Sequence, residues 1–76
     1  MALEDSGRAD GAAEVYRRLY LEYPGRSDLL YRLGGTLVKA GRPEEAAVLL
    51  KGRLSRFPTD SRAQLALGDA YFAMGR

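Results

Sequence analysis

The chain contains neither cysteine nor histidine among its 76 residues. Without cysteine it has no disulfide and no thiolate nucleophile, and without histidine it lacks the commonest general base and a frequent metal ligand. No apolar run approaches the ~18 residues that a membrane-spanning helix needs. The N-terminus has no basic segment followed by an apolar one, so it does not resemble a secretory signal. We therefore expect no catalytic residues, no metal and no cofactor, and a soluble chain for which the cytoplasm is the favoured compartment.

The sequence also contains no long block of residues that carry the same charge. Twelve lysines and arginines face ten acidic residues, which leaves a formal net charge of +2. Acids and bases are interleaved along the chain, a pattern typical of a solvated surface. Nucleic-acid binding is accordingly not expected. RNA binding through the basic residues is the weakest alternative, and salt-sensitive binding would support it.

What the chain does contain is an internal repeat. A shift of 34 residues aligns 42 residue pairs, of which 11 are identical. The Leu-Gly pair at 33–34 recurs at 67–68, and Pro24 recurs as Pro58. Such a fixed period is typical of arrays whose units bury their apolar faces against their neighbours. One domain over residues 1–76 is expected, with a partial unit at 1–26, a complete unit at 27–60 and a partial unit at 61–76.

The complete unit is predicted to be a pair of helices. Ser27 and Asp28 can cap and charge the start of the first helix, and Gly41 can close it in the left-handed conformation. Pro43 suits the first turn of the second helix, which is expected to stop before Phe57-Pro58. No alternating pattern indicates a strand.

The flanking units follow the same logic. They predict helices at about 9–22 and 61–74, the second capped by Asp60 or Ser61, with residues 1–6 as the last turns of a preceding helix. Gly34 and Gly68 fall inside predicted helices, where glycine costs about 1 kcal/mol relative to alanine. Their recurrence predicts a close approach of a neighbouring helix, beside Ala46 in the complete unit.

These features resemble the tetratricopeptide repeat, a helix-turn-helix unit. The matching positions are Leu33-Gly34, Leu37, Ala46, Leu50 and Pro58 in the complete unit, Ala12, Tyr16 and Pro24 before it, and Leu67-Gly68 and Tyr71 after it. Leu30 and Gln64 replace the usual leading aromatic, and Arg53 replaces a small alanine. The resemblance implies an all-α fold, a right-handed superhelical stack of antiparallel helix pairs of the α-solenoid type.

The resemblance also implies a non-catalytic scaffold that binds a peptide or a partner surface in its concave groove. Carried over position by position, the groove comprises Asp28, Tyr31, Arg32, Gly35, Val38, Lys39, Arg62, Leu65, Asp69, Phe72 and Ala73. Tyr31 and Phe72 would hold apolar side chains, and the basic residues would pair with carboxylates unless they are simply solvated. The subfamily that clamps chaperone C-termini uses asparagines, and this chain has none. That specific function is not expected.

The alternative is a structural or oligomerisation segment of a larger enzyme or secretion component. The two partial units predict a piece of a longer array. Leu67, Tyr71 and Met74 would then lie partly uncovered, which predicts self-association. The expected contact surface on the other copy is near Val15, Leu19 or residues 1–6, in a head-to-tail contact, with a face-to-face dimer as the alternative.

Overall fold

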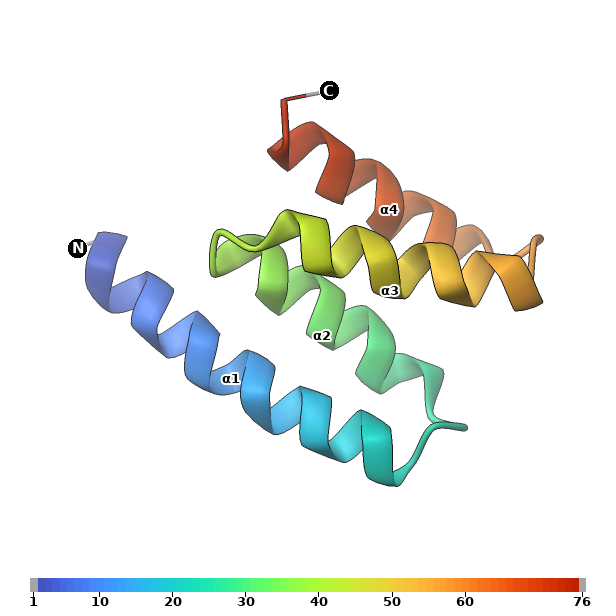
Figure 1. Cartoon of the computed structure of the whole chain (residues 1–76), viewed down its shortest axis with the longest axis horizontal. Helices are drawn as coiled ribbons and strands as arrows, with labels where there is room; N and C mark the ends of the chain where they lie inside the picture. Colours follow the sequence, from blue (N-terminus) through green and yellow to red (C-terminus); the bar gives the residue numbers. More distant parts are fainter. Residues whose placement is uncertain (1, 76) are drawn as a thin grey trace.

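The computed structural model describes residues 2–75, and the side chains of residues 7–75. This part of the chain consists of four helices: α1 (Ala2–Glu22), α2 (Ser27–Lys39), α3 (Pro43–Arg56) and α4 (Ser61–Ala73). Consecutive helices run in opposite directions (Figure 1). Together they form a slab of 37 × 31 × 14 Å. The prediction of an all-α stack of helix pairs is confirmed.

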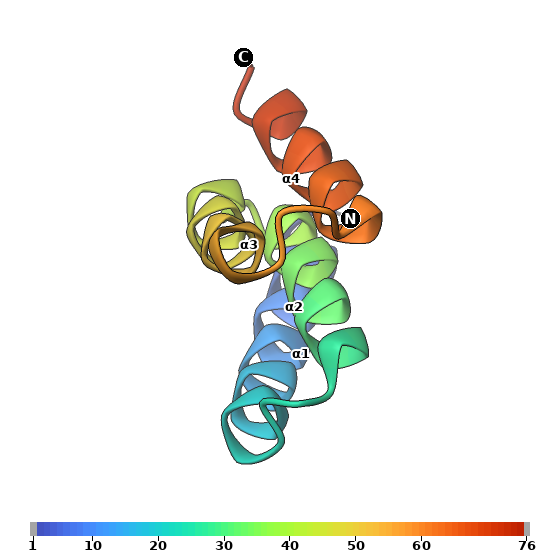
Figure 2. The same cartoon turned by 90° about the vertical axis from the view of Figure 1, so that its right-hand side faces the viewer.

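Helix α2 lies at the centre of the stack. It packs against α1, α3 and α4, whereas α1 has no Cα atom within 8 Å of α3 or α4 in the described range. After a 90° turn, α3 lies to one side of the column formed by α1, α2 and α4 (Figure 2). The first helices of the two later units, α2 and α4, are therefore neighbours across the stack.

The helix ends follow the predicted turn chemistry with one exception. Gly41 takes φ 77°, the left-handed conformation, and Pro43 opens α3. Asp60 caps α4, because its side chain accepts a hydrogen bond from the Ala63 amide. Ser27 does not cap α2: the capping position is Arg26, which makes no side-chain capping bond.

A larger correction concerns the first helix. A break near Gly7 was expected, but α1 runs without interruption from Ala2 to Glu22. The position equivalent to Pro43 is Ala9, which has a backbone N–H and does not restrict the residue before it. Gly7 does not have the positive φ of Gly41. Without a proline the helix simply continues.

Small and branched apolar residues from all four helices form the core. One cluster joins Ala13 of α1, Leu37 of α2, Ala46 of α3 and Ala70 of α4, each with no exposed surface. A second cluster joins Leu30, Leu50 and Ala63. No polar side chain is buried among the described residues. The alanines let the helices approach, and the leucines of α2 fill the space between them.

The two recurring glycines have different surroundings. A Cβ added at Gly34 would lie 3.5 Å from Leu50 Cδ1, so the packing partner is Leu50 and not Ala46 as predicted. A Cβ added at Gly68 would meet no described atom within 4 Å. Within the described residues, Gly68 therefore has no packing partner equivalent to Leu50.

Candidate functional site

A hollow of about 460 Å³ lies between α2 and α4. It forms because the two helices are first helices of successive units and present the same faces side by side. Its lining comprises Tyr31, Gly34, Gly35, Val38, Lys39, Ala66, Asp69, Phe72 and Ala73. We call this hollow the α2/α4 groove.

Seven of the eleven positions predicted for the groove line this hollow. They are Tyr31, Gly35, Val38, Lys39, Asp69, Phe72 and Ala73. Asp28, Arg32, Arg62 and Leu65 do not line it. Gly34 and Ala66 do line it and were not predicted. Ala66 could have been found from its helical spacing, since it lies three residues before Asp69 and seven before Ala73.

The walls of the groove are apolar and its rim carries both charges. Phe72 is 84% exposed, a large fraction for an aromatic side chain in a concave surface. Space is open above Gly35, where an added Cβ would meet no described atom within 4 Å. Lys39 of α2 and Asp69 of α4 supply one cation and one anion. The groove can therefore hold an apolar side chain between oppositely charged rim positions.

Tyr31 forms a fixed wall of the groove. Its hydroxyl donates a hydrogen bond to Asp60, and the guanidinium of Arg62 lies 5.5 Å from the centre of its ring. Desolvation of the hydroxyl, together with the carboxylate of Asp60, raises the pKa of Tyr31. The Tyr31 hydroxyl is thus engaged within the fold, and the ring is the part that a ligand would contact.

Asp60 joins three helices at one end of the groove. It accepts from the Tyr31 hydroxyl of α2, from Arg53 Nε of α3 at 2.7 Å and from the Ala63 amide of α4 at 3.1 Å. These hydrogen bonds, the one from Tyr31 foremost, lower the pKa of Asp60 to about 2. The arginine at position 53, which departs from the family pattern, has a structural role as a partner of this carboxylate.

Acid should weaken the stack through Asp60. Because its pKa in the folded chain lies below the ordinary value of 3.8, its contribution to stability is present above pH 4 and is lost as the pH falls towards 2. We expect Asp60→Ala to lower the melting temperature at pH 7 by about 5 °C or more, because the cap and two other partners are lost. Thermal unfolding by circular dichroism at pH 7 and pH 2 measures both effects. An Asp60→Ala variant with the same drop between these pH values as the wild type would contradict this role.

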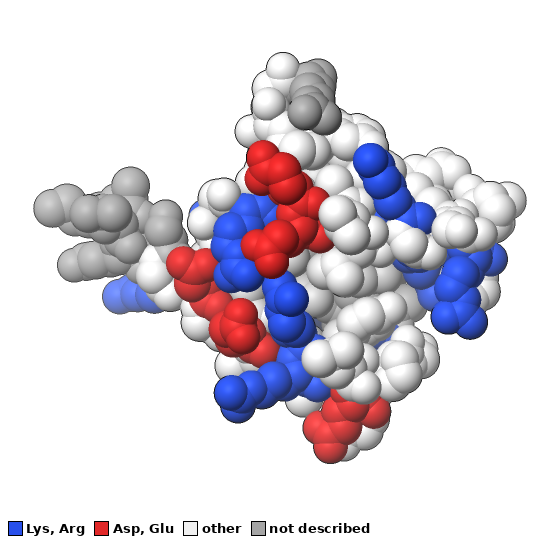
Figure 3. Space-filling model, viewed as in Figure 1, with Lys and Arg blue, Asp and Glu red and all other residues white. Residues whose placement is uncertain are grey.

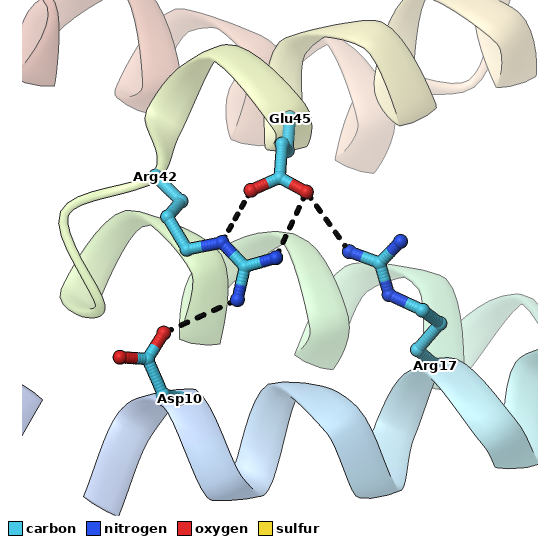
Figure 4. A network of polar contacts seen from close by, with 4 residues as sticks. All are labelled: Asp10, Arg17, Arg42 and Glu45. Carbon is cyan, nitrogen blue, oxygen red and sulfur yellow. Dashed lines mark hydrogen bonds and ion pairs between the residues drawn. The ribbon is translucent and has the colours of Figure 1, made fainter. Parts of the chain in front are cut away.

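A second polar network joins α1 to the start of α3. Arg42 donates hydrogen bonds to Glu45 and, from Nη1, to Asp10 Oδ1 at 3.1 Å. Arg17 Nη2 donates a hydrogen bond to Oε1 of the same Glu45 at 3.1 Å (Figure 4). The hydrogen bond from Arg42 is the main cause that lowers the pKa of Glu45. Acidic and basic side chains also lie next to one another on the face of the molecule that Figure 3 shows. The network connects two helices whose backbones do not approach each other.

Two hollows larger than the α2/α4 groove flank α1. One of about 660 Å³ separates α1 from α3 and is lined by Tyr20, Val48, Gly52, Arg56 and Phe57 among others. The other, of about 610 Å³, lies beside α1 and α2 and is lined by Arg8, Ala9, Ala12, Tyr16, Thr36 and Lys39. Neither contains the residues carried over to the concave face, apart from Lys39 at the edge of the second.

The described residues include no cluster of three or more acidic side chains arranged to hold a metal ion. Over the same part of the chain, every helix is too short or too polar to cross a membrane.

The stacked helix pairs, with their first helices lining a hollow, define an α-helical repeat protein. The family model for the tetratricopeptide repeat matches residues 3–54 and again residues 37–76. The chain therefore belongs to the tetratricopeptide repeat family. Neither a curated protein nor a solved structure matches it. Tetratricopeptide repeats generally mediate protein–protein interactions and are typically non-catalytic.

Proposed function

We propose that the chain binds a peptide segment of a partner protein in the α2/α4 groove, and that it acts by binding rather than by catalysis. The observation that carries the proposal is the groove itself, an apolar hollow of about 460 Å³ flanked by the 84% exposed Phe72. A large exposed aromatic beside a concavity is a common anchor for a partner side chain.

The chemistry of the groove supports a peptide with an apolar residue next to an acidic one. The apolar side chain would lie over Gly35, between Tyr31 and Phe72, where space is open. Lys39 is exposed, and no described carboxylate lies within 4.0 Å of its ammonium group. An acidic residue of the peptide would pair with Lys39 at the rim.

The most selective test fills the groove without disturbing the fold. Gly35→Gln places a side chain over the floor, and glutamine favours a helix more than glycine does, so stability should rise by about 0.5–1 kcal/mol. Peptides selected from a phage-displayed random library against the wild-type chain should bind this variant at least about tenfold more weakly. Fluorescence anisotropy with labelled peptides measures the dissociation constants.

Gly52→Gln is the matched control. Gly52 is also exposed in a helix interior, with nothing within 4 Å of an added Cβ, but it lies on α3 away from the groove. Its variant should bind the selected peptides as the wild type does. If peptides bind wild type and Gly35→Gln equally, or lose binding only with Gly52→Gln, the groove is not the site.

A further inference from the structure

We propose that the chain associates with further copies of itself head to tail, with α4 of one copy packed against α1 of the next. In this arrangement α4 and the neighbour's α1 form a helix pair that reproduces the α2–α3 pair inside the chain. The partner is thus a second copy of the chain, and the argument is independent of the peptide proposed above.

The α2–α3 pair is the template for this contact. Gly34 of α2 faces Leu50 of α3, and the two residues are buried. Leu37 packs in the same cluster as Ala46, and both have no exposed surface. A glycine and leucines on the first helix therefore meet alanine and leucine on the second.

Helix α4 carries the same face without a cover. The equivalents of Gly34 and Leu37 are Gly68 and Tyr71. Gly68 is exposed, and no described atom would lie within 4 Å of a Cβ added there. Tyr71 is half-buried where Leu37 is fully buried. Within the described residues, nothing occupies the position over Gly68 that Leu50 occupies over Gly34.

Helix α1 carries the complementary face. The equivalents of Ala46 and Leu50 are Ala12 and Tyr16. Ala46 and Leu50 are at most 1% exposed, whereas Ala12 and Tyr16 are half-buried and line the hollow of about 610 Å³ beside α1. If the first helix of a repeat unit were placed in this hollow, it would cover both residues. Helix α4 of a second copy is the first helix of such a unit.

Charge supports the same register. Inside the chain, Arg42 Nη1 at the start of α3 lies 3.1 Å from Asp10 Oδ1 of α1, which is the second helix of the preceding unit. The equivalent pair across the junction is Arg8 of one copy and Glu44 of the other. Both are exposed, and no described side chain of opposite charge lies within 4.0 Å of either. The junction would bring opposite charges together.

The sequence alone predicted a contact near Val15 and Leu19 of α1. In the α2–α3 pair, however, the contact is made by Ala46 and Leu50, so the equivalent contact on α1 is made by Ala12 and Tyr16. The two surfaces are different, so the interface is heterologous and each copy keeps one free face of each kind. Association therefore continues beyond a dimer unless an end is blocked.

Sedimentation equilibrium across a wide concentration range tests the junction. The average mass of the wild-type chain should rise with concentration beyond that of a dimer. Gly68→Gln fills the position of the neighbour's Tyr16 and should remain a monomer, while its fold and the α2/α4 groove stay intact, since Gly68 lines no part of that groove. Gly52→Gln should associate as the wild type does. A monomeric wild type, or association unchanged by Gly68→Gln, would overturn the proposal.

Mixing two blocked variants distinguishes this junction from a symmetric dimer. Ala12→Gln blocks the α1 face and should also be monomeric alone. An equimolar mixture of Ala12→Gln and Gly68→Gln should form a one-to-one complex. The free α4 face of Ala12→Gln would pair with the free α1 face of Gly68→Gln, and the two remaining faces are blocked, so the complex grows no further. If Ala12→Gln alone still forms dimers, the contact joins two α4 faces and the head-to-tail arrangement is wrong. Circular dichroism confirms that each variant is folded.

Discussion

Gly34→Leu is expected to lower the melting temperature by about 4–24 °C, whereas Gly34→Ala should leave it unchanged or raise it. An alanine Cβ would meet Leu50 at 3.5–3.9 Å, which is ordinary van der Waals contact, and alanine favours a helix over glycine by about 1 kcal/mol. The further carbons of leucine would enter the space of Leu50, which is 1% exposed. Overpacking of this kind costs about 1–3 kcal/mol, and each kilocalorie moves the melting temperature of so small a domain by about 4–8 °C.

Thermal unfolding at low concentration measures this difference, and Gly52→Leu is the control. Gly52 also lies in a helix interior, but an added Cβ there would meet no described atom. Gly52→Leu should therefore melt at or above the wild-type temperature. Equal melting temperatures for Gly34→Leu and Gly34→Ala would show that Leu50 leaves room for a large side chain at position 34.

Leu37→Ala should have the largest effect on stability of any single truncation considered. Leu37 has no exposed surface and belongs to the cluster that joins all four helices. Truncation of a buried leucine costs about 2–5 kcal/mol, because the neighbours close the cavity only in part. That loss is a large share of the free energy of unfolding of a small domain, about 5–15 kcal/mol in general. We therefore expect a variant that still folds but whose free energy of unfolding is lower by about 2–5 kcal/mol.

Urea denaturation followed by circular dichroism measures the free energy of unfolding of this variant. Leu65→Ala is the matched control, since Leu65 is a leucine of α4 with 69% of its surface exposed. Its truncation should change the free energy of unfolding by about 0.5 kcal/mol or less. A loss below about 1 kcal/mol for Leu37→Ala would mean that the four helices do not share one core.

The period of the sequence was sufficient to predict the fold from α2 onwards. Proline and glycine mark the ends of these helices directly, as Pro43 opens α3 and Gly41 closes α2. The start of α1 was not predictable by analogy, because Ala9 stands where the complete unit has proline. A repeat transfers a helix boundary only where the residue that causes the boundary is repeated.

The groove was predictable in part for a related reason. The resemblance to the tetratricopeptide repeat implies which face of a helix lines the groove, and Gly35, Val38 and Phe72, which it assigns to that face, line the hollow. It does not specify which long side chains turn towards a neighbour. Arg62 turns over the ring of Tyr31, and Asp28 pairs with Arg26 at 2.9 Å instead of lining the groove. Such pairs depend on tertiary distances that a spacing rule does not contain.

The hydrogen bond between Tyr31 and Asp60 is likewise a side-chain pair that the spacing of the repeat does not predict. Arg53 was visible in the sequence only as a departure from the family pattern. In the structure it shares Asp60 with Tyr31, so three helices meet at one carboxylate beside the groove. A substitution that departs from a repeat pattern can therefore indicate a compensating partner elsewhere in the unit.

The most direct test of the central claim is a nuclear magnetic resonance titration of the ¹⁵N-labelled chain with a peptide selected against it. If the α2/α4 groove is the binding site, the largest amide shifts should fall on Tyr31, Gly35, Val38, Asp69 and Phe72. Amides beside the hollow between α1 and α3, such as Val48 and Gly52, should change little. Shifts concentrated at Val48 and Gly52, with Gly35 and Phe72 unaffected, would contradict the account.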